Sequence, residues 1–549
     1  MTGNTGFNLI DEPWIVMLGR DGKERQESIL GVFEQAQHFR TIGGEVPTQA
    51  FAITRMLLAL LHRALDGPAD QQDWEQLWAA GQLPMDAIRA YANRVHDRFD
   101  LFDPVAPFYQ VAGLRTAQGE VFSLDRIVAD VPNGEPLFTT RSAADLARMS
   151  PAEAARWLVH VHAFDPSGIK SGAVGDGTVK YGKGYPIGPG WSGQIGCVLP
   201  QGGDLRETLV LNLVAREVDT YVRIGGHDDV PPWERDPDGA AWGERLPRGA
   251  IDLYTWQTRR VRLAGDRDGV VGVVLANGDR IQPQNRHGVE PHTAWRYSEP
   301  QSKKLKTVVY MPRMHDPSRS VWRGIGALLP SISGRGKATG PEPQPFLAPG
   351  VLQWISDLAS QGLLPETYRP GIRVCGTQYG AQNATFAEIV EDVLPMSIIV
   401  LRADRPAAGQ AAENAVKDAE HVASAIWMLA ENIAQAAGAE PKSGAGDSAR
   451  ERLYAALEAP YRRWLAALVP GRDTDEARAE WQQMIAGLTK PIVDELISAA
   501  SLSAWVGREV KSRLVNVALA EVWFNAALRH ALPLAQHRLR NTTPEEASV

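Results

Sequence analysis

The alanine-rich C-terminal part of the chain is the feature that most constrains the fold. From about residue 405 onward alanine dominates, β-type alternation vanishes, and glycine is sparse outside the connections. Four amphipathic segments follow one another, at residues 408–437, 448–468, 473–500 and 504–532. Because the connections are short, neighbouring segments are expected to run antiparallel. The sequence therefore predicts an antiparallel four-helix bundle over residues 401–535 and a disordered tail over 536–549.

Residues 1–400 predict one large mixed domain, so the expected fold class is α+β, with small sheets and glycine-rich loops ahead of the bundle. Helical spacing of apolar residues predicts helices at 48–65, 72–79, 84–99, 151–164 and 351–361. Strand patterns occur at 7–17, 195–214, 253–262 and 270–276, a strand or hairpin is expected over 301–309, and strand–loop–strand over 371–396.

Charge and cysteine content narrow the class of protein. Net charge is −8, whereas a protein that coats nucleic acid by itself is usually basic. A nucleic-acid contact would therefore use local patches, or the chain would act as one subunit of an assembly. Cys197 and Cys375 alone make no disulfide framework. The N-terminus lacks a signal-peptide pattern and the apolar runs are too short for a membrane span, so a cytoplasmic location without a membrane partner is expected.

The glycine-rich stretch at 167–190 is a candidate contact with nucleic acid. A third of its residues are glycine, and it carries Lys170, Lys180 and Lys183. Glycine lets the backbone approach another surface closely, and lysine supplies a point charge for phosphate. A mobile surface loop is the alternative. Residues 177–184 come near the Walker A pattern, but Gly184 stands where the Mg²⁺-binding hydroxyl belongs, so a P-loop is not expected.

Three further stretches have two readings each. Lys303, Lys304 and Lys306 form the densest lysine cluster, which suits either phosphate contact or a solvated hairpin edge. Gln382 and Asn383 present adjacent amides at a turn, where amides can meet base edges or serve as ordinary turn residues. Phe138, in a loop with little periodicity, either folds back on its own domain or anchors a partner.

Catalytic patterns are not evident in the sequence. HExxH, GxSxG and CxxC do not occur, and the Asp-x-Asp triplets at 236–238, 266–268 and 473–475 fall in turns or at a helix start. His160 and His162 are two residues apart in a predicted helix, which favours a structural role over metal binding. We therefore expect no enzyme activity, no catalytic residue, no metal and no cofactor.

The collinear order of several motifs resembles one family. The segments FNLIDEPWIVM, APFYQV, the glycine-rich stretch, LYTWQTRR, HDPSRS and YGAQNA precede the C-terminal bundle, and together they resemble the CasA family, the large subunit of the type I-E Cascade complex. The resemblance implies a non-catalytic subunit of an RNA-guided DNA surveillance complex in antiviral defence. Its implied partners are the guide RNA, other Cascade subunits, target double-stranded DNA and a helicase-nuclease recruited in trans.

The resemblance also implies roles for individual residues. Gly182, Lys183 and Gly184, with Lys306 or, in a shifted register, Lys304, would read the protospacer-adjacent motif (PAM) through the minor groove. Gln382 or Asn383 would wedge open the duplex to start an R-loop. Phe138, Thr139 and Thr140 would form a loop toward the RNA and neighbouring subunits, with Thr140 where the family has asparagine.

Two other functions stay open from the sequence. One is an interaction scaffold whose bundle binds partners without reading DNA, and the other is an unrecognised hydrolase or nuclease. Convergence of residues 182–184, 306 and 382–383 on one face would favour the DNA-reading function over the scaffold.

Overall fold

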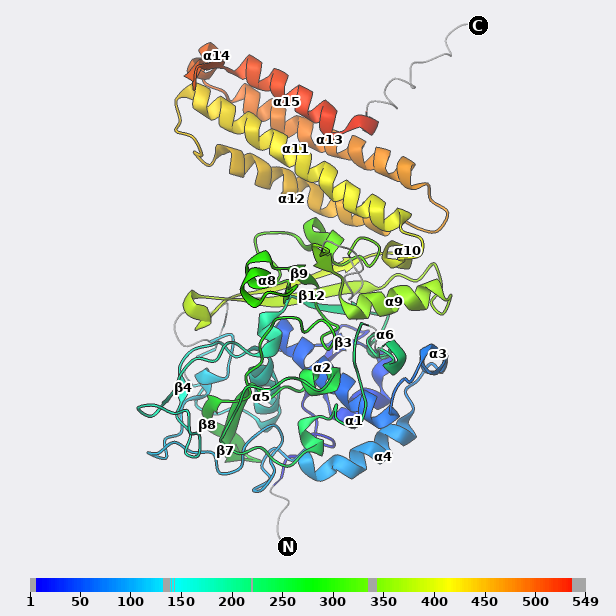
Figure 1. Cartoon of the computed structure of the whole chain (residues 1–549), viewed down its shortest axis with the longest axis vertical. Helices are drawn as coiled ribbons and strands as arrows, with labels where there is room; N and C mark the ends of the chain where they lie inside the picture. Colours follow the sequence, from blue (N-terminus) through cyan, green and yellow to red (C-terminus); the bar gives the residue numbers. More distant parts are fainter. Residues whose placement is uncertain are drawn as a thin grey trace. The chain divides into compact units, whose positions relative to one another are not determined.

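The computed structural model describes residues 6–131, 139, 141–142, 144–218, 221–333 and 343–535, which form two compact units (Figure 1). The first unit comprises Met1–Val321, Ser333–Leu363 and Pro370–Val393. The second comprises Trp322–Ile332, Leu364–Arg369 and Leu394–Val549. The expected α+β class with small sheets is confirmed. The predicted tail at 536–549 lies outside the described residues.

Helix α2 (Pro47–Leu65) forms the centre of the first unit. It begins with proline at its first turn and is buried along nearly its whole length. Arg55 on this helix pairs with the equally buried Glu290 at 2.8 Å. Helix α5 (Pro151–Phe164) packs against α2 and begins where Ser150 accepts the N–H of Glu153. Both helices confirm the sequence prediction.

The remaining helices of the first unit are short. They are α1 (Ile29–Glu34), α3 (Gln71–Ala79), α4 (Met85–Val95), α6 (Leu205–Leu211), α7 (Ala250–Tyr254), α8 (Glu299–Leu305) and α9 (Gly350–Ser360).

The sheets of the first unit have two or three strands each. The three-stranded sheets are β2 (Glu24–Glu27)–β1 (Ile15–Gly19)–β3 (Phe39–Ile42), β13 (Phe386–Pro395)–β12 (Gly371–Tyr379)–β6 (Cys197–Gln201) and β10 (Tyr310–Pro312)–β9 (Trp295–Tyr297)–β11 (Phe346–Leu347). The two-stranded sheets are β4 (Lys170–Ser171)–β5 (Lys183–Gly184) and β7 (Arg259–Asp266)–β8 (Gly269–Asn277). The strand–loop–strand expected over 371–396 is confirmed.

Four strand predictions in the first unit were wrong in whole or in part. The strand expected at 7–17 begins only at Ile15. Residues 205–211 form α6, because Asp204 accepts the N–H of Glu207 and starts a helix in an apolar run that suits either structure. The expected strand at 253–262 begins only at Arg259, after helix α7. The lysine-rich segment at 301–309 is mostly helix α8, with proline in its first turn and a Glu299–Lys303 ion pair at 2.6 Å one turn apart.

Four long helices pack against one another in the second unit: α11 (Ala407–Ala437), α12 (Ala445–Ala466), α13 (Thr474–Ser498) and α15 (Val517–Ala531). Helix α11 contacts each of the other three. The buried Trp481 donates its Nε1–H to the carbonyl of Ala415 at 2.8 Å. Arg478 pairs with the buried Asp418 at 2.8 Å, so both apolar packing and ion pairing join α13 to α11.

The fourth amphipathic segment is not one helix, which corrects the expectation for 504–532. Helix α14 (Leu502–Val506) ends at Gly507, whose φ is +79°. Strands β14 (Arg508–Val510) and β15 (Arg513–Val515) then form a hairpin whose turn residues, Lys511 and Ser512, both have positive φ. The surrounding alanine content concealed this β signal. No helix among the described residues is long and apolar enough to cross a membrane.

Candidate nucleic-acid interface

The glycine-rich stretch folds as a hairpin with a cationic tip. In β4–β5, Lys170 faces Gly184 and Ser171 faces Lys183. At the tip, Lys180 and Lys183 exchange two backbone hydrogen bonds of 3.1 and 3.0 Å around Tyr181 and Gly182, whose φ values are 52° and 71°. Two positive-φ residues make a tight mirror-type turn, which requires a permissive residue such as Gly182.

This glycine-rich tip, residues 180–183, exposes an aromatic side chain as well as two lysines. Lys180 and Lys183 are exposed, and Tyr181 is 94% exposed. Lys180 was noted in the sequence as one lysine of this stretch, and it and Tyr181 directly precede Gly182 and Lys183, the predicted PAM-reading residues. Gly184 is buried, and a Cβ there would come within 3.0 Å of the Asn277 amide nitrogen. Gly182 and Lys183 are therefore the predicted residues that face solvent.

The turn expected to act as the wedge, residues 380–385, joins β12 to β13, and we call it the wedge turn. The N–H of Gly380 donates to the Thr385 carbonyl at 2.9 Å, and the N–H of Asn383 donates to the Gly380 carbonyl at 3.0 Å. Gln382 and Asn383 are exposed and both have φ of 56°. Asparagine tolerates the left-handed region better than glutamine does. An unfavourable backbone conformation in an exposed turn is not stabilised by packing in a core, and such conformations often mark functional sites.

The lysine cluster does not lie on a hairpin. Lys303 pairs with Glu299 on α8, whereas no ion pair among the described residues involves Lys304 or Lys306. Both are exposed, and Lys306 ends α8 in the left-handed conformation, with φ of 54°. Within the part of the chain that the structure describes, the cluster thus offers two cations without an ion-pair partner at the end of a short helix.

The loop expected to contact RNA is described only at its margins. Phe138 and Thr140 lie outside the described residues. Thr139 donates its hydroxyl to Asp130 at 3.1 Å and accepts the N–H of Arg141. Arg141 in turn pairs with Asp130 at 3.0 Å and with Glu153 on α5 at 2.7 Å. These contacts fasten the residues just before and just after the loop to each other and to α5.

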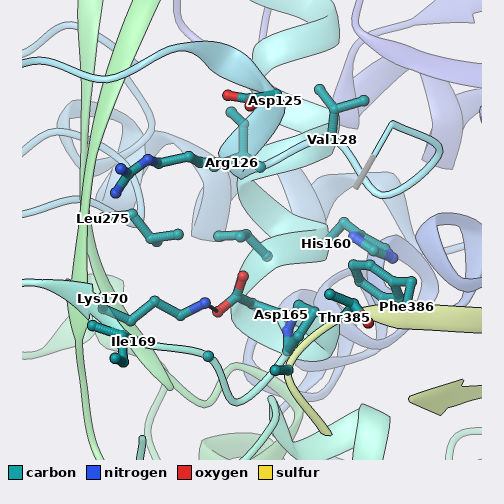
Figure 2. Close-up of a pocket in the computed structure, with 15 residues that line it drawn as sticks. Asp125, Arg126, Val128, His160, Asp165, Ile169, Lys170, Leu275, Thr385 and Phe386 are labelled. Carbon is teal, nitrogen blue, oxygen red and sulfur yellow. Dashed lines mark ion pairs between the residues drawn. The ribbon is translucent and has the colours of Figure 1, made fainter. Parts of the chain in front are cut away.

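The start of the glycine-rich stretch lies against the wedge turn, although no described contact joins residues 182–184 themselves to Gln382 or Asn383. The N–H of Ser167, at the start of the glycine-rich stretch, donates to the carbonyl of Asn383 at 2.7 Å. Beside this contact is a cavity of about 220 Å³, lined by residues of segments 125–128, 165–170 and 384–386 (Figure 2). Among the described contacts none joins Lys306 to either segment.

The two histidines of α5 are structural, as expected. His160 Nε2 lies 2.9 Å from the Thr48 hydroxyl, and His162 Nε2 lies 2.8 Å from the Tyr109 carbonyl. Burial lowers the pKa of each imidazole to about 3, so both rings are neutral. The described residues contain no group of three or more side chains arranged to hold a metal ion.

Comparisons with known proteins agree on one family. The family model of the CRISPR-associated protein Cse1 matches residues 8–491. CRISPR-associated protein CasA/Cse1 of Thermus thermophilus is 31% identical over 525 residues, which cover 91% of each chain. The crystal structure of Thermobifida fusca Cse1 is 45% identical, covers 97% of this chain and 99% of that chain, and gives a TM-score of 0.89.

A more distant solved structure shares the fold. A chain of a CRISPR RNA-guided surveillance complex is 17% identical, covers 90% of this chain and 99% of that chain, and gives a TM-score of 0.66. Together, the matches place this chain among the CRISPR-associated proteins. Within that class it belongs to the Cse1 (CasA) family, which confirms the resemblance carried by the order of its motifs.

Proposed function

We propose that the chain is a non-catalytic subunit of an RNA-guided Cascade surveillance complex in antiviral defence. In this role it reads the PAM of target duplex DNA through the minor groove and wedges open the adjoining base pair to start an R-loop. The observation that carries the proposal is the junction between the glycine-rich stretch and the wedge turn, where Ser167 N–H meets the Asn383 carbonyl. Family membership and the net charge of −8 support a subunit that works within an assembly.

The glycine-rich tip supplies the PAM-reading element. Gly182 allows close backbone approach to a groove, while Lys180 and Lys183 place positive charge on either side of the turn. The minor groove distinguishes mainly A·T from G·C pairs. A contact of this kind gives a permissive reader, and base pairing to the guide RNA supplies the remaining sequence specificity.

The wedge turn supplies the opening element, and Gln382 is its leading side chain. Gln382 is the central residue of the 3₁₀ turn Ala381–Asn383 and no hydrogen bond among the described residues engages its amide. At Asn383 the backbone is tethered, because its main-chain carbonyl accepts the Ser167 N–H. Separating the first pair costs a few kcal/mol of stacking and pairing, so a side chain fixed in place by a strained turn suits this task.

The other expected sites complete the proposal. Lys304 and Lys306 add phosphate or groove contacts from the end of α8, and Thr139 with Phe138 and Thr140 contacts the guide RNA and neighbouring subunits. Helices α11, α12, α13 and α15 act as the antiparallel four-helix bundle of the second unit. The subunit also docks the helicase-nuclease that acts on the opened target.

A scaffold function without DNA reading is the second candidate, favoured by one observation. Leu502, Val506 and Val522, on α14 and α15, are 86%, 78% and 60% exposed. Apolar side chains gathered on neighbouring elements are typical of protein-binding surfaces. Under this alternative, substitutions on α14 would abolish complex assembly and substitutions at the tips would change nothing.

The experiment is target binding by the reconstituted RNA-guided complex. Wild type is compared with Lys306→Ala and with Gln382→Ala/Asn383→Ala, each on a PAM-containing duplex and on the same duplex with the first pairs mismatched open. We expect the wedge variant to bind the closed duplex weakly and the pre-opened duplex normally. Unchanged binding of both variants to both duplexes would favour the scaffold.

A further inference from the structure

The glycine-rich tip and the wedge turn share a buried attachment, which we call the tip anchor and define as Asp165, Ser167, Arg259 and Tyr379. Asp165 Oδ2 accepts the Arg259 Nε–H at 2.5 Å and lies 2.7 Å from Lys170 Nζ. The carboxylate is 3% exposed and the Arg259 side chain is fully buried. Figure 2 shows Lys170 pointing at Asp165 along one wall of the cavity. A buried charge that is paired twice is held firmly in place.

Arg259 fixes both ends of the glycine-rich stretch. Its Nη2 donates to the carbonyl of Pro166 at 2.8 Å and to that of Gly188 at 2.9 Å. The Gly188 N–H donates back to the Ser167 hydroxyl at 3.2 Å. The planar guanidinium can hold a carboxylate and several carbonyls at once, which a lysine ammonium cannot do with the same geometry. One side chain on β7 therefore sets the separation of the two ends of the hairpin.

Residues of the tip anchor also contact the wedge turn and the strand that precedes it. The Ser167 N–H binds the Asn383 carbonyl within the turn. Tyr379, the last residue of β12, donates its hydroxyl to the carbonyl of Phe164 at 2.6 Å. Residues 164–167 thus contact both the turn and the strand that leads into it.

We propose that the tip anchor is a positioning device that fixes the glycine-rich tip and the wedge turn relative to each other. A duplex engaged by the first tip then meets the second at the base pair next to the PAM. This inference rests on the proposed function and deepens it, because the anchor residues touch no DNA and act through the two tips. A functional group must be held within about 0.5 Å of its working position, and exposed turns cannot achieve this alone.

The test uses a variant that loosens the anchor without removing its buried charges. Ser167→Ala/Tyr379→Phe deletes the hydroxyl contacts to Gly188 and Phe164 and keeps Asp165, Arg259 and both tips. The matched control is Tyr310→Phe, which loses a hydroxyl bond of 3.1 Å to the Gln344 carbonyl elsewhere in the first unit. In the reconstituted complex we expect the anchor variant to bind the closed PAM duplex about tenfold more weakly. Its binding to the pre-opened duplex, and the control's binding to both, should match wild type.

A double-mutant cycle separates positioning from general structural damage. Lys183→Ala and Gln382→Ala are measured singly and together on the closed duplex, in the wild-type and anchor-variant backgrounds. In the wild-type background, we expect the losses of binding free energy caused by Lys183→Ala and Gln382→Ala to be non-additive. In the anchor-variant background, we expect them to be additive. Retained coupling in the anchor variant, or equal weakening on closed and pre-opened duplexes, would overturn this inference alone. No effect of either tip substitution in the wild-type background would overturn the proposed function, and this inference with it.

Discussion

The hairpin tips and the tip anchor beneath them differ in almost every physical respect. At the tips, Tyr181 is 94% exposed, and Gln382 holds a left-handed backbone conformation in an exposed turn. In the anchor, Asp165 and Arg259 are buried and bonded to each other, and Arg259 also donates to four backbone carbonyls. The tips therefore carry side chains that contribute little to folding, and the anchor carries a buried ion pair that contributes strongly to it.

This contrast separates two kinds of substitution. A change at a tip should alter DNA binding and leave the free energy of unfolding almost unchanged, because exposed side chains contribute little to stability. A change in the anchor should lower stability strongly if it removes a buried charge.

Arg259→Met is expected to have the largest effect on stability. The substitution leaves Asp165 with only the Lys170 ammonium and removes the donors to the Pro166 and Gly188 carbonyls. Breaking a buried pair in this way typically costs about 3–5 kcal/mol. Urea unfolding with the matched control Arg280→Met, whose side chain is 44% exposed, checks it. Equal loss in the two variants would contradict the contrast between buried and exposed sites.

The buried histidines of α5 predict a pH dependence of stability. Both pKa values are lowered to about 3 in the folded chain from an ordinary value of 6.5. Between these values the unfolded chain binds more protons, so stability should fall as pH falls from about 6.5 toward 3. Each histidine contributes about 1.4 kcal/mol per pH unit within this window.

His162→Gln should make this pH dependence shallower by about one proton. Unfolding free energies at about pH 7.5 and about pH 5 measure the slope. The matched control is His227→Gln, at an exposed histidine, which should keep the wild-type slope. A variant slope equal to that of wild type would show that His162 takes up its proton without unfolding.

Lys183→Ala should weaken DNA binding by the complex and leave stability within about 0.5 kcal/mol of wild type. If Lys183 neutralises one phosphate, the slope of log affinity against log salt should become shallower by about 1. Salt titrations of duplex binding measure this. Lys23→Ala, an exposed lysine in the turn between β1 and β2, is the control and should keep the wild-type slope.

Gln382→Gly should give a small change in stability, with a positive sign. Glycine adopts the left-handed conformation without the steric cost of a Cβ, so the free energy of unfolding should stay equal or rise by up to about 1 kcal/mol. Duplex opening should nevertheless be lost, because the wedge side chain is gone. A clear loss of stability on denaturant unfolding would show that Gln382 serves the fold.

Much of the fold could be predicted from local patterns. The helices at 48–65 and 151–164 have long apolar periodicity and proline at the first turn, and both were found. Short segments were harder. The apolar run 205–211 suits a strand or a buried helix, and the cap at Asp204 decided for a helix. The hairpin at 508–515 was concealed within an alanine-rich surrounding.

One part of the candidate site could be predicted from the sequence and another part could not. The tips were visible in the sequence because glycines, amides and lysines mark turns and nucleic-acid contacts. The anchor was not, because Asp165 and Arg259 are 94 residues apart and neither belongs to a recognisable motif. Only the tertiary fold brings β7 beneath the glycine-rich hairpin, so no local pattern could have predicted the pair.

The central claim is that the wedge turn opens the first base pair next to the PAM. The most direct measurement places a fluorescent base analogue at that position in a PAM duplex and follows its unstacking by the reconstituted complex. We expect a fluorescence rise with wild type and almost none with Gln382→Ala/Asn383→Ala, at concentrations where both are bound. An equal rise with both complexes would contradict it and show that another element opens the duplex.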